Sequence, residues 1–516
     1  MLLTLTSIAS LASCGGGGGG TSPAPTPTPT PVPVTGSPWW GYGGDAQHTA
    51  QSGIATQPLN RIQWSTSMDL QPQRTSTGAL LIHYGSPVVT AKNTVIVPVK
   101  TGALDGFSFN AFSGGSGTAL WTMATDYALP PHRWTPSVGM VLTRSNRLFA
   151  PAVGGKLMVR SDADSANATV QSVVFYGASQ YAAAKATFDA NVFISTPLTA
   201  DNDGNIFFGF VVTGANPAGL QSGLARVAPD GSGIWVGAKA ASANPGIDKI
   251  ATNCAPALSL DFKTVYVAVN TPVVTGTIQT GFLLALDSTT LATKAVAPLL
   301  DPKLGVPARI NDDGTSSPSV GSDGDVYYGV LEAVSQSHNS RGWLLHFDAT
   351  LAQSKIPGSF GWDDTASMVP ASMVASYTGS SRYLLMTKYN NYAGSGTGDG
   401  KNRIAVLDPQ QSQADTISGL PVMREIQTQL GQTVDPGYPL GVKEWCINTA
   451  AVDPFTKSIL VNNEDGYLYR WDMATNQLTE RVQLTSGVGE AYTPTIIGAD
   501  GAVFAVNNAI LFSVGR

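Results

Sequence analysis

Charged side chains are scarce in this sequence. Asp, Glu, Lys and Arg make up 12% of the chain, against roughly 25% of an average globular protein. The 35 acidic and 29 basic residues give a net charge of −6, and they are scattered along the chain. Proteins that bind nucleic acid usually gather Lys and Arg on one face. This distribution therefore argues against a nucleic-acid partner.

Familiar catalytic and metal-binding motifs are missing as well. The sequence contains no G-x-S-x-G turn, no phosphate-binding loop and no H-E-x-x-H pair, which removes the main support for a hydrolase or a zinc enzyme. The five histidines are scattered, and the three cysteines are far apart. We therefore predict no metal site from Cys or His spacing.

Long hydrophobic runs are absent after residue 14, so the mature chain is not expected to span a bilayer. Residues 2–13 are a short apolar segment that ends in Leu11-Ala12-Ser13-Cys14 and precedes six glycines. This segment resembles the lipobox of bacterial lipoprotein signal peptides. The resemblance implies that residues 1–13 are cleaved off and that the Cys14 thiol carries a diacylglycerol.

The segment departs from that pattern in one respect, because no Lys or Arg precedes its apolar stretch, as a signal peptide normally requires. A start codon further upstream would supply the missing charge. The alternative is an ordinary secretory signal with an incidental cysteine, and both interpretations export the protein. Gly15, in place of the Asp that retains many lipoproteins at the inner membrane, implies the outer membrane, with its periplasmic side and the cell surface both open.

Residues 14–38 follow as a Gly-, Thr- and Pro-rich stretch with little apolar content. Glycines make a chain flexible, and alternating Thr and Pro favour an extended polyproline geometry. We expect a disordered tether that holds a domain, residues 39–516, away from a membrane.

That domain contains one repeated pattern: a small polar residue, a short apolar strand, a Gly/Asp/Asn turn and a second strand rich in Val, Tyr and Phe. Asp-Gly and Asn-Gly supply the positive φ of tight hairpins. The pattern occurs at 85–99, 135–151, 195–211, 254–269, 316–330, 369–386, 448–462 and 492–506. Repeats of this size indicate an array of sheets, and eight of them predict an all-β fold, an eight-bladed β-propeller.

Residues 111–121, AFSGGSGTALW, resemble the Ala-x-Asp-x-x-Thr-Gly-x-x-x-Trp motif of quinoprotein-type propellers at Ala111, Gly117 and Trp121. Serines replace the Asp and the Thr of that motif. The strand at 62–68 has no preceding partner in sequence, so we expect it to close the last blade, with Trp64 in the position of Trp121. Such closure protects the open edge of a linear array.

Candidate site residues come from the loops before each repeat, because these loops ring the channel of a propeller. Charged and aromatic side chains gather there more densely than elsewhere, and we predict a polar ligand site from His132, Arg133, Trp134, Arg309, Asp312, Asp313, Trp362, Asp363, Asp364, Lys443, Glu444, Trp445 and Glu490. The alternative is that these groups only solvate the channel mouth. The acid pairs 312–313 and 363–364 could also supply oxygen ligands for Ca²⁺.

Three functions remain open. The lipid anchor and the missing catalytic signatures favour a monomeric, non-enzymatic binding or assembly module of the cell envelope, similar to the propeller lipoprotein of the outer-membrane β-barrel assembly machinery. A quinoprotein dehydrogenase would hold pyrroloquinoline quinone and Ca²⁺ in the channel, but its larger members carry adjacent cysteines. Here Cys254 and Cys446 could form a disulfide in an exported protein, although their places in non-neighbouring blades favour two buried thiols. A glycan binder would use Trp134, Trp362 and Trp445 as stacking platforms.

Overall fold

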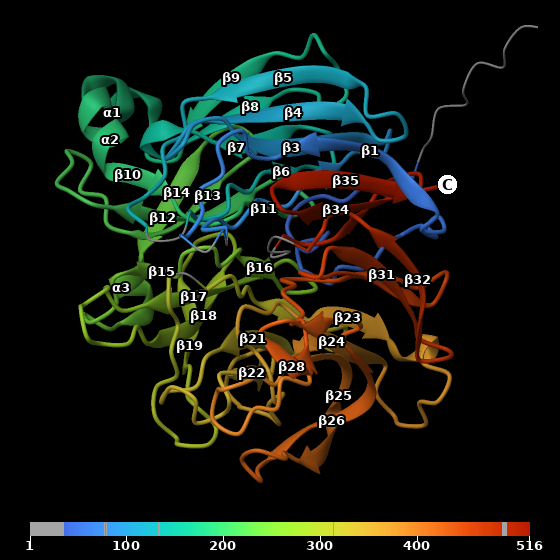
Figure 1. The fold of residues 1–516 in the computed structure, drawn as a ribbon. Coiled ribbons are helices and arrows are strands. Elements are labelled where there is room, and N and C mark those ends of the chain that lie inside the picture. Colours follow the sequence, from blue (N-terminus) through green and yellow to red (C-terminus); the bar gives the residue numbers. More distant parts are fainter. Residues whose placement is uncertain (1–35, 77, 79, 133–134, 313, 488–492) are drawn as a thin grey trace, which may run out of the picture. The chain divides into compact units, whose positions relative to one another are not determined.

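Eight antiparallel sheets form the blades of a β-propeller (Figure 1). The computed structural model describes residues 36–516 except 77, 79, 133–134, 313 and 488–492. The predicted signal peptide, Cys14 and most of the predicted tether therefore lie outside the described residues. Among the described residues, no helix has the length and apolar character needed to cross a membrane.

Each blade begins with a short innermost strand, and seven blades contain at least four strands. Blade 1 contains β2 (Val88–Val89), β3 (Thr94–Lys100), β4 (Phe107–Ser113) and β5 (Ala119–Thr125). Blade 2 contains β6 (Val141–Leu142), β7 (Leu148–Pro151), β8 (Lys156–Arg160) and β9 (Val170–Val174). Blade 3 contains β10 (Val192–Ile194), β11 (Thr199–Ala200), β12 (Ile206–Val212), β13 (Gly223–Val227) and β14 (Gly233–Gly237). Blade 4 contains β15 (Lys249–Ile250), β16 (Ala257–Leu258), β17 (Thr264–Asn270), β18 (Gly281–Asp287) and β19 (Thr293–Pro298).

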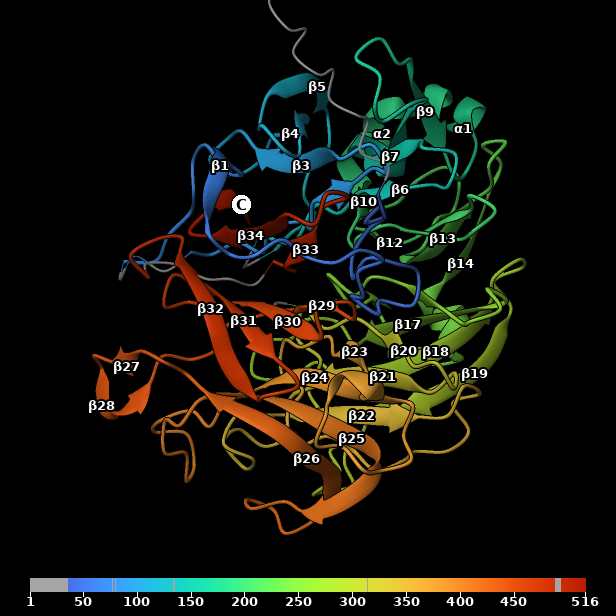
Figure 2. The same cartoon turned by 90° about the vertical axis from the view of Figure 1, so that its right-hand side faces the viewer.

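Blades 5 and 6 contain β20 (Ser319–Val320), β21 (Val326–Val330), β22 (Trp343–Phe347), and β23 (Ser367–Pro370), β24 (Tyr383–Tyr389), β25 (Arg403–Ala414), β26 (Pro421–Leu430). Blades 7 and 8 contain β29 (Ala451–Asp453), β30 (Ser458–Asn462), β31 (Tyr467–Asp472), β32 (Gln477–Gln483), and β33 (Ile496–Ile497), β34 (Val503–Asn507), β35 (Ile510–Gly515), β1 (Arg61–Ser67). A separate hairpin, β27 (Val434–Asp435) and β28 (Tyr438–Val442), projects from the blades (Figure 2).

Three short helices complete the described elements: α1 (Ala178–Ala183), α2 (Lys185–Asn191) and α3 (Ala238–Ser242). The first two fall in the Ala-rich segment between blades 2 and 3. All eight repeats found in the sequence correspond to blades, so the predicted fold is confirmed. Cys254 and Cys446 are both buried and are not joined by a disulfide, which agrees with the alternative that the sequence favours.

The burial of the strands follows from stacking blade against blade. Both faces of a middle strand are covered by neighbouring blades, and every residue of β3 and β21 is buried. An outer strand has one face against a neighbour and the other in solvent, so β32 alternates exposed and half-buried residues. Continuous apolar runs in the middle strands and alternation in the outer ones are therefore expected.

The N-terminal strand closes the ring. β1 pairs antiparallel with β35, with Arg61 opposite Gly515 and Ser67 opposite Ile510, and the two strands lie side by side in Figure 1. Trp64 on β1 donates its indole N–H to the Gly114 carbonyl of blade 1 (2.7 Å). Trp121 on β5 makes the same bond to Ala163 of blade 2 (2.9 Å). The predicted closure and the predicted equivalence of the two tryptophans are both confirmed.

Candidate functional site

Residues 39–52 form a strap across one end of the central channel. The strap makes backbone hydrogen bonds with the innermost strands of six blades, at Val89, Leu142, Leu258, Val320, Met368 and Val452. Several of these are the last residues of their strands, so the strap lies at the end where the innermost strands finish. Within residues 45–52, alternate side chains are buried, as in a strand that has one covered face.

Tyr42 extends from the strap into the channel. Its hydroxyl hydrogen-bonds to Thr365 Oγ1 (2.7 Å), to the Asn448 side-chain oxygen and to the Thr315 carbonyl (3.4 Å). Burial raises the pKa of the Tyr42 phenol to about 12. The axial space around this ring has a volume of only about 10 Å³ and is lined by Tyr42, His83, Tyr84, Ser86, Ser137, Asn253, Thr315, Asn448 and Pro494.

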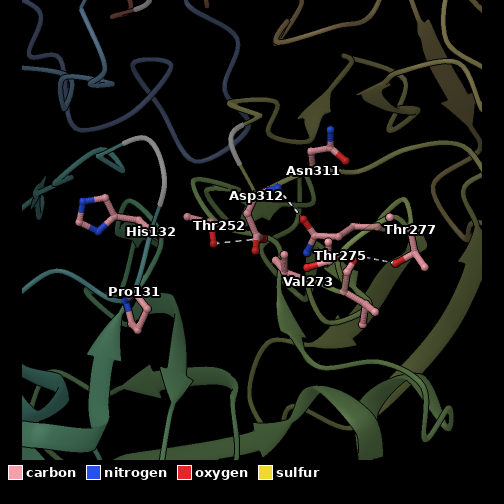
Figure 3. Close-up of a pocket in the computed structure, with 11 residues that line it drawn as sticks. Pro131, His132, Thr252, Val273, Thr275, Thr277, Asn311 and Asp312 are labelled. Carbon is pink, nitrogen blue, oxygen red and sulfur yellow. Dashed lines mark hydrogen bonds between the residues drawn. The ribbon is translucent and has the colours of Figure 1, made fainter. Parts of the chain in front are cut away.

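The opposite end of the channel, where loops lead into the innermost strands, carries two larger cavities. The first, the His132 cavity, has a volume of about 430 Å³ and is lined by Pro131, His132, Thr252, Val273, Val274, Thr275, Gly276, Thr277, Gln279, Asn311 and Asp312. Figure 3 shows His132 and Pro131 facing the loop of residues 273–277 across this space. The predicted site residues His132 and Asp312 both line it.

Asp312 forms the polar floor of the His132 cavity. Its Oδ1 forms an ion pair with Lys249 and accepts hydrogen bonds from Asn270 Nδ2 (2.9 Å) and Thr252 Oγ1 (3.3 Å; Figure 3). Burial opposes ionisation of this carboxyl, but Lys249 and the hydrogen bonds outweigh burial and hold its pKa below the usual range. The carboxylate is therefore neutralised by the protein and is not available to pair with a cationic ligand.

The second cavity, the Arg309 cavity, has a volume of about 380 Å³ and is lined by Arg309, Leu331, Ser335, Ser340, Trp362, Lys388, Tyr392, Glu444 and Cys446. Three of the predicted site residues, Arg309, Trp362 and Glu444, meet here. Two buried side chains, Glu332 and Asn390, hold the backbone around this cavity through hydrogen bonds. The Glu332 carboxylate accepts the backbone N–H groups of Ser340 (2.8 Å) and Gly342 (2.9 Å), and Asn390 hydrogen-bonds to both the N–H and the carbonyl of Trp445 (3.1 Å each).

A buried charged group lies beneath the Arg309 cavity. Lys388 is 1% exposed, and its charge lowers the pKa of Asp364 and of His83. Burial dominates at both partners: it raises the pKa of Asp364 to about 7 and lowers that of His83 to about 3. Asp364 accepts a hydrogen bond from the Thr387 hydroxyl. At neutral pH this carboxyl is therefore only partly ionised.

The remaining predicted residues lie elsewhere. Asp363 is buried and accepts a hydrogen bond from the Thr315 N–H (2.8 Å), and Lys443 is half-buried beside the Arg309 cavity without lining it. Trp445 is fully buried against Tyr469, so its ring is not exposed for stacking. Four others, Arg133, Trp134, Asp313 and Glu490, lie outside the described residues, and among the described residues no three His, Cys, Asp or Glu side chains are grouped as metal ligands.

Sequence reasoning missed Lys388, Tyr392 and the loop of residues 273–277. Lys388 stands inside the apolar strand β24, where a lysine with both faces of its strand covered is unusual, and that mismatch was the available signal. The 273–277 loop carries only Val, Thr and Gly, and nothing in its composition marks it as a cavity wall.

Comparisons with known proteins give information about the fold and not about the activity. No protein-family model matches the sequence, and no curated protein matches it. The structure is similar to a europium-containing methanol dehydrogenase (TM-score 0.55, 9% identity, 91% of this chain and 89% of that one). It is also similar to a quinohemoprotein alcohol dehydrogenase from Comamonas testosteroni (TM-score 0.53, 11% identity, 93% and 81%). BamB from Moraxella catarrhalis aligns with a TM-score of 0.43 at 12% identity over 88% and 100%.

These similarities show the β-propeller fold alone, and the axial space does not fit pyrroloquinoline quinone, the cofactor that the sequence resemblance implies. A space of about 10 Å³ holds about one water molecule, whereas small-molecule sites measure roughly 300–1,000 Å³. Tyr42 is one of the residues that line this small space. The two described cysteines are separate thiols in different blades, so they form no pair beneath a cofactor.

Proposed function

We propose that the protein is a lipid-anchored binding module of the bacterial cell envelope, exported and held at the outer membrane through Cys14, and that it acts as a monomer without catalysis. The observation that carries this proposal is the division of the channel. One end is covered by the strap, the axis is filled by Tyr42, and two cavities of ligand size open at the other end.

The place where the chain joins the propeller supports a tethered arrangement. Gly36 donates its N–H to the Ala91 carbonyl (2.9 Å), in the turn that follows β2 and therefore at the strap end of the channel. Gly36, where the described residues begin, therefore lies at the end of the channel opposite the loops around both cavities. The anchored domain would then present its cavities to small molecules or to other envelope components.

A glycan ligand is the second candidate, and the Arg309 cavity favours it. Trp362 and Tyr392 are aromatic residues in its lining, and Ser335, Ser340 and Glu444 supply hydrogen-bonding groups. A quinoprotein dehydrogenase receives no such support, because its cofactor does not fit the axis.

The test combines acylation with activity. Cells that express the full chain are fed an alkyne-tagged palmitate, with Cys14→Ser as the matched control, and the purified protein is assayed for alcohol-dependent dye reduction with pyrroloquinoline quinone and Ca²⁺. We expect label on the wild type only and no dye reduction above that of the protein without alcohol. Equal labelling of both chains would refute the lipid anchor, and alcohol-dependent dye reduction would refute the non-enzymatic role.

A further inference from the structure

His338 lies enclosed between blades 5 and 6. It belongs to the segment of residues 331–342, which connects β21 to β22 and forms part of the wall of the Arg309 cavity. The imidazole is 0% exposed and stacks on the indole of Trp343, with ring centroids 3.8 Å apart and an angle of 3° between the planes. Asp415, in the turn between β25 and β26 of blade 6, contacts the same imidazole. This histidine therefore links a wall of the cavity to the neighbouring blade.

Both ring nitrogens of His338 face oxygen atoms that accept hydrogen bonds. Nδ1 lies 2.9 Å from the Gly342 carbonyl oxygen, and a carbonyl has no proton to donate. Nε2 lies 3.1 Å from Asp415 Oδ2. A neutral imidazole carries one N–H group, and an imidazolium carries two. If Asp415 is ionised, both contacts are hydrogen bonds only when His338 is positively charged.

Other donors hold Asp415 as a carboxylate. Its Oδ2 accepts the N–H and the O–H of Ser418 (2.6 Å each) and the N–H of Ile417 (3.2 Å), while its Oδ1 accepts the Ser359 O–H (2.6 Å). Burial opposes ionisation of this carboxyl, but the hydrogen bonds from His338, Ser359 and Ser418 outweigh burial and hold its pKa below the usual range. The proton between Asp415 and His338 therefore belongs to the imidazole.

Ser359 offers the alternative donor to Nε2. Its Oγ lies 3.4 Å from His338 Nε2 but 2.6 Å from Asp415 Oδ1, and a hydroxyl has a single proton to donate. The shorter contact assigns that proton to Asp415. The same geometry differs from a catalytic triad, because Asp415 and Ser359 both meet Nε2, whereas in a triad the acid binds the other ring nitrogen.

The other charges around His338 balance one another. Among the described residues, Asp415 is the only charged side chain that contacts the imidazole. Burial raises the pKa of Tyr389, so its phenol stays neutral. Two bases and two acids in the surrounding segments bind elsewhere: Lys303 on the Ser337 carbonyl (2.8 Å), Arg341 over the Tyr389 ring (4.1 Å), Glu332 on the Gly342 N–H (2.9 Å) and Glu425 on the Tyr389 hydroxyl (2.8 Å).

We propose that His338 is a buried imidazolium that latches residues 331–342, and with them the wall of the Arg309 cavity, to blade 6, and that loss of its second proton at alkaline pH releases this latch. A neutral His338 with its proton on Nδ1 would leave Nε2 and the Asp415 carboxylate as two buried acceptors without a proton between them, which is unfavourable. The face of the Trp343 indole also favours a cation. The latch is closed at neutral pH and opens as the pH rises, whatever ligand the cavity takes.

Nitrogen-15 NMR of the full chain, purified in detergent and labelled at histidine, reads the protonation state directly. At pH 7.5 an ordinary histidine, which titrates near about 6.5, is mostly neutral. We expect both ring nitrogens of His338 to carry protons at this pH. His48 is the internal control, because its Nδ1 contacts the Pro318 carbonyl (2.7 Å), its Nε2 has no hydrogen-bond partner among the described residues, and burial lowers its pKa to about 4. An unprotonated ring nitrogen in His338 at pH 7.5 would overturn the proposal.

Variants identify the signals and the group responsible. His338→Gln removes the two signals assigned to this residue. Asp415→Asn removes the negative charge but keeps an amide beside Nε2, so we expect His338 to become neutral at pH 7.5. Asp230→Asn, at an exposed carboxyl between β13 and β14, is the matched control and should leave His338 charged. Double protonation that persists in Asp415→Asn would contradict the role given to Asp415.

Hydrogen exchange of the wild-type full chain tests the latch without any variant. Exchange of the amides in residues 331–342, corrected for its intrinsic pH dependence, is compared between pH 7 and pH 10. The internal control is β34, a buried strand without an ionisable side chain. Because the latch is a charge-assisted hydrogen bond, we expect protection of residues 331–342 to fall by about tenfold or more and that of β34 to change by less than about twofold. Equal changes in both regions, or no change in either, would show that His338 does not latch the cavity wall.

Discussion

Tyr42 joins the strap to three blades through a single hydroxyl, so Tyr42→Phe tests whether the strap contributes to stability. The hydroxyl contacts three residues that lie in the loops leading into blades. These are Thr365 before blade 6, Asn448 before blade 7 and Thr315 before blade 5. The substitution keeps the ring that fills the axis and removes only these three hydrogen bonds. No cavity larger than an oxygen atom is created.

The expected cost follows from what each partner keeps. The Asn448 side-chain oxygen still accepts the Thr449 hydroxyl (2.9 Å), Thr365 Oγ1 still accepts the Ser317 N–H (2.9 Å), and the Thr315 carbonyl still accepts the Asn448 amide (3.1 Å). Each of these three atoms therefore keeps one hydrogen bond. With a net value of about 1 kcal/mol per hydrogen bond and one of the three long, we expect the free energy of unfolding to fall by about 1–2 kcal/mol.

Urea titration followed by tryptophan fluorescence measures this change as a shift of the midpoint at constant slope. Tyr438→Phe on β28 is the matched control, because its hydroxyl has no hydrogen bond among the described residues, and we expect a change below about 0.5 kcal/mol. A loss below about 0.3 kcal/mol in Tyr42→Phe would show that the three bonds are replaced by water, and the strap would then not be a stabilising element.

Three further results are expected. Trp64→Phe and Trp121→Phe each remove one indole hydrogen bond to the next blade, so each should lower the free energy of unfolding in urea by about 1 kcal/mol; no change in either would reduce this contact to ring packing. Cys254 is fully buried, and burial raises its pKa to about 12, so a thiol reagent should modify it only after unfolding, and fast labelling of the native protein would contradict the burial. Burial raises the pKa of Asp364 from 3.8 to about 7, so folding takes up a proton between about pH 4 and 7 and stability falls as pH rises through that window. Asp364→Asn removes this slope, and its stability relative to the wild type should increase from pH 5 to pH 8 in urea titrations; a constant difference would refute the raised pKa.

The blades were predictable because each is specified locally. Every repeat contains its own apolar runs and, in several cases, an Asp-Gly turn, and the glycines at 324, 466 and 501 adopt the positive φ that such turns require. Closure was predictable for a related reason: the strand at 62–68 had no partner nearby, and Trp64 repeated the role of Trp121. Local patterns determine how many blades form and how the ring ends.

The strap and the cavities were not predictable, because their partners are distant in sequence. Ala46 and Ala50 pair with blades more than two hundred and four hundred residues away, so no local sequence pattern identifies their partners. The sequence predicts charged loops around a channel, but it does not show which of these loops line which of the two cavities. That division depends on how far the 273–277 loop and the 331–341 segment extend, which side-chain chemistry does not reveal.

Through the strap and β1, residues 39–67 depend on contacts with blades 7 and 8. Arg61 and Arg516 are hydrogen-bonded across 455 positions, and Ala50 on the strap pairs with Val452. Contacts at such separations form late because loop closure costs entropy before it brings any gain. The backbone hydrogen bonds of residues 39–67 to blades 7 and 8 therefore cannot form until those blades have folded. The end of the channel that the strap covers is completed only when the whole ring is complete, whereas the loops that line the Arg309 cavity belong to blades 4 to 7 and are assembled from neighbours in sequence.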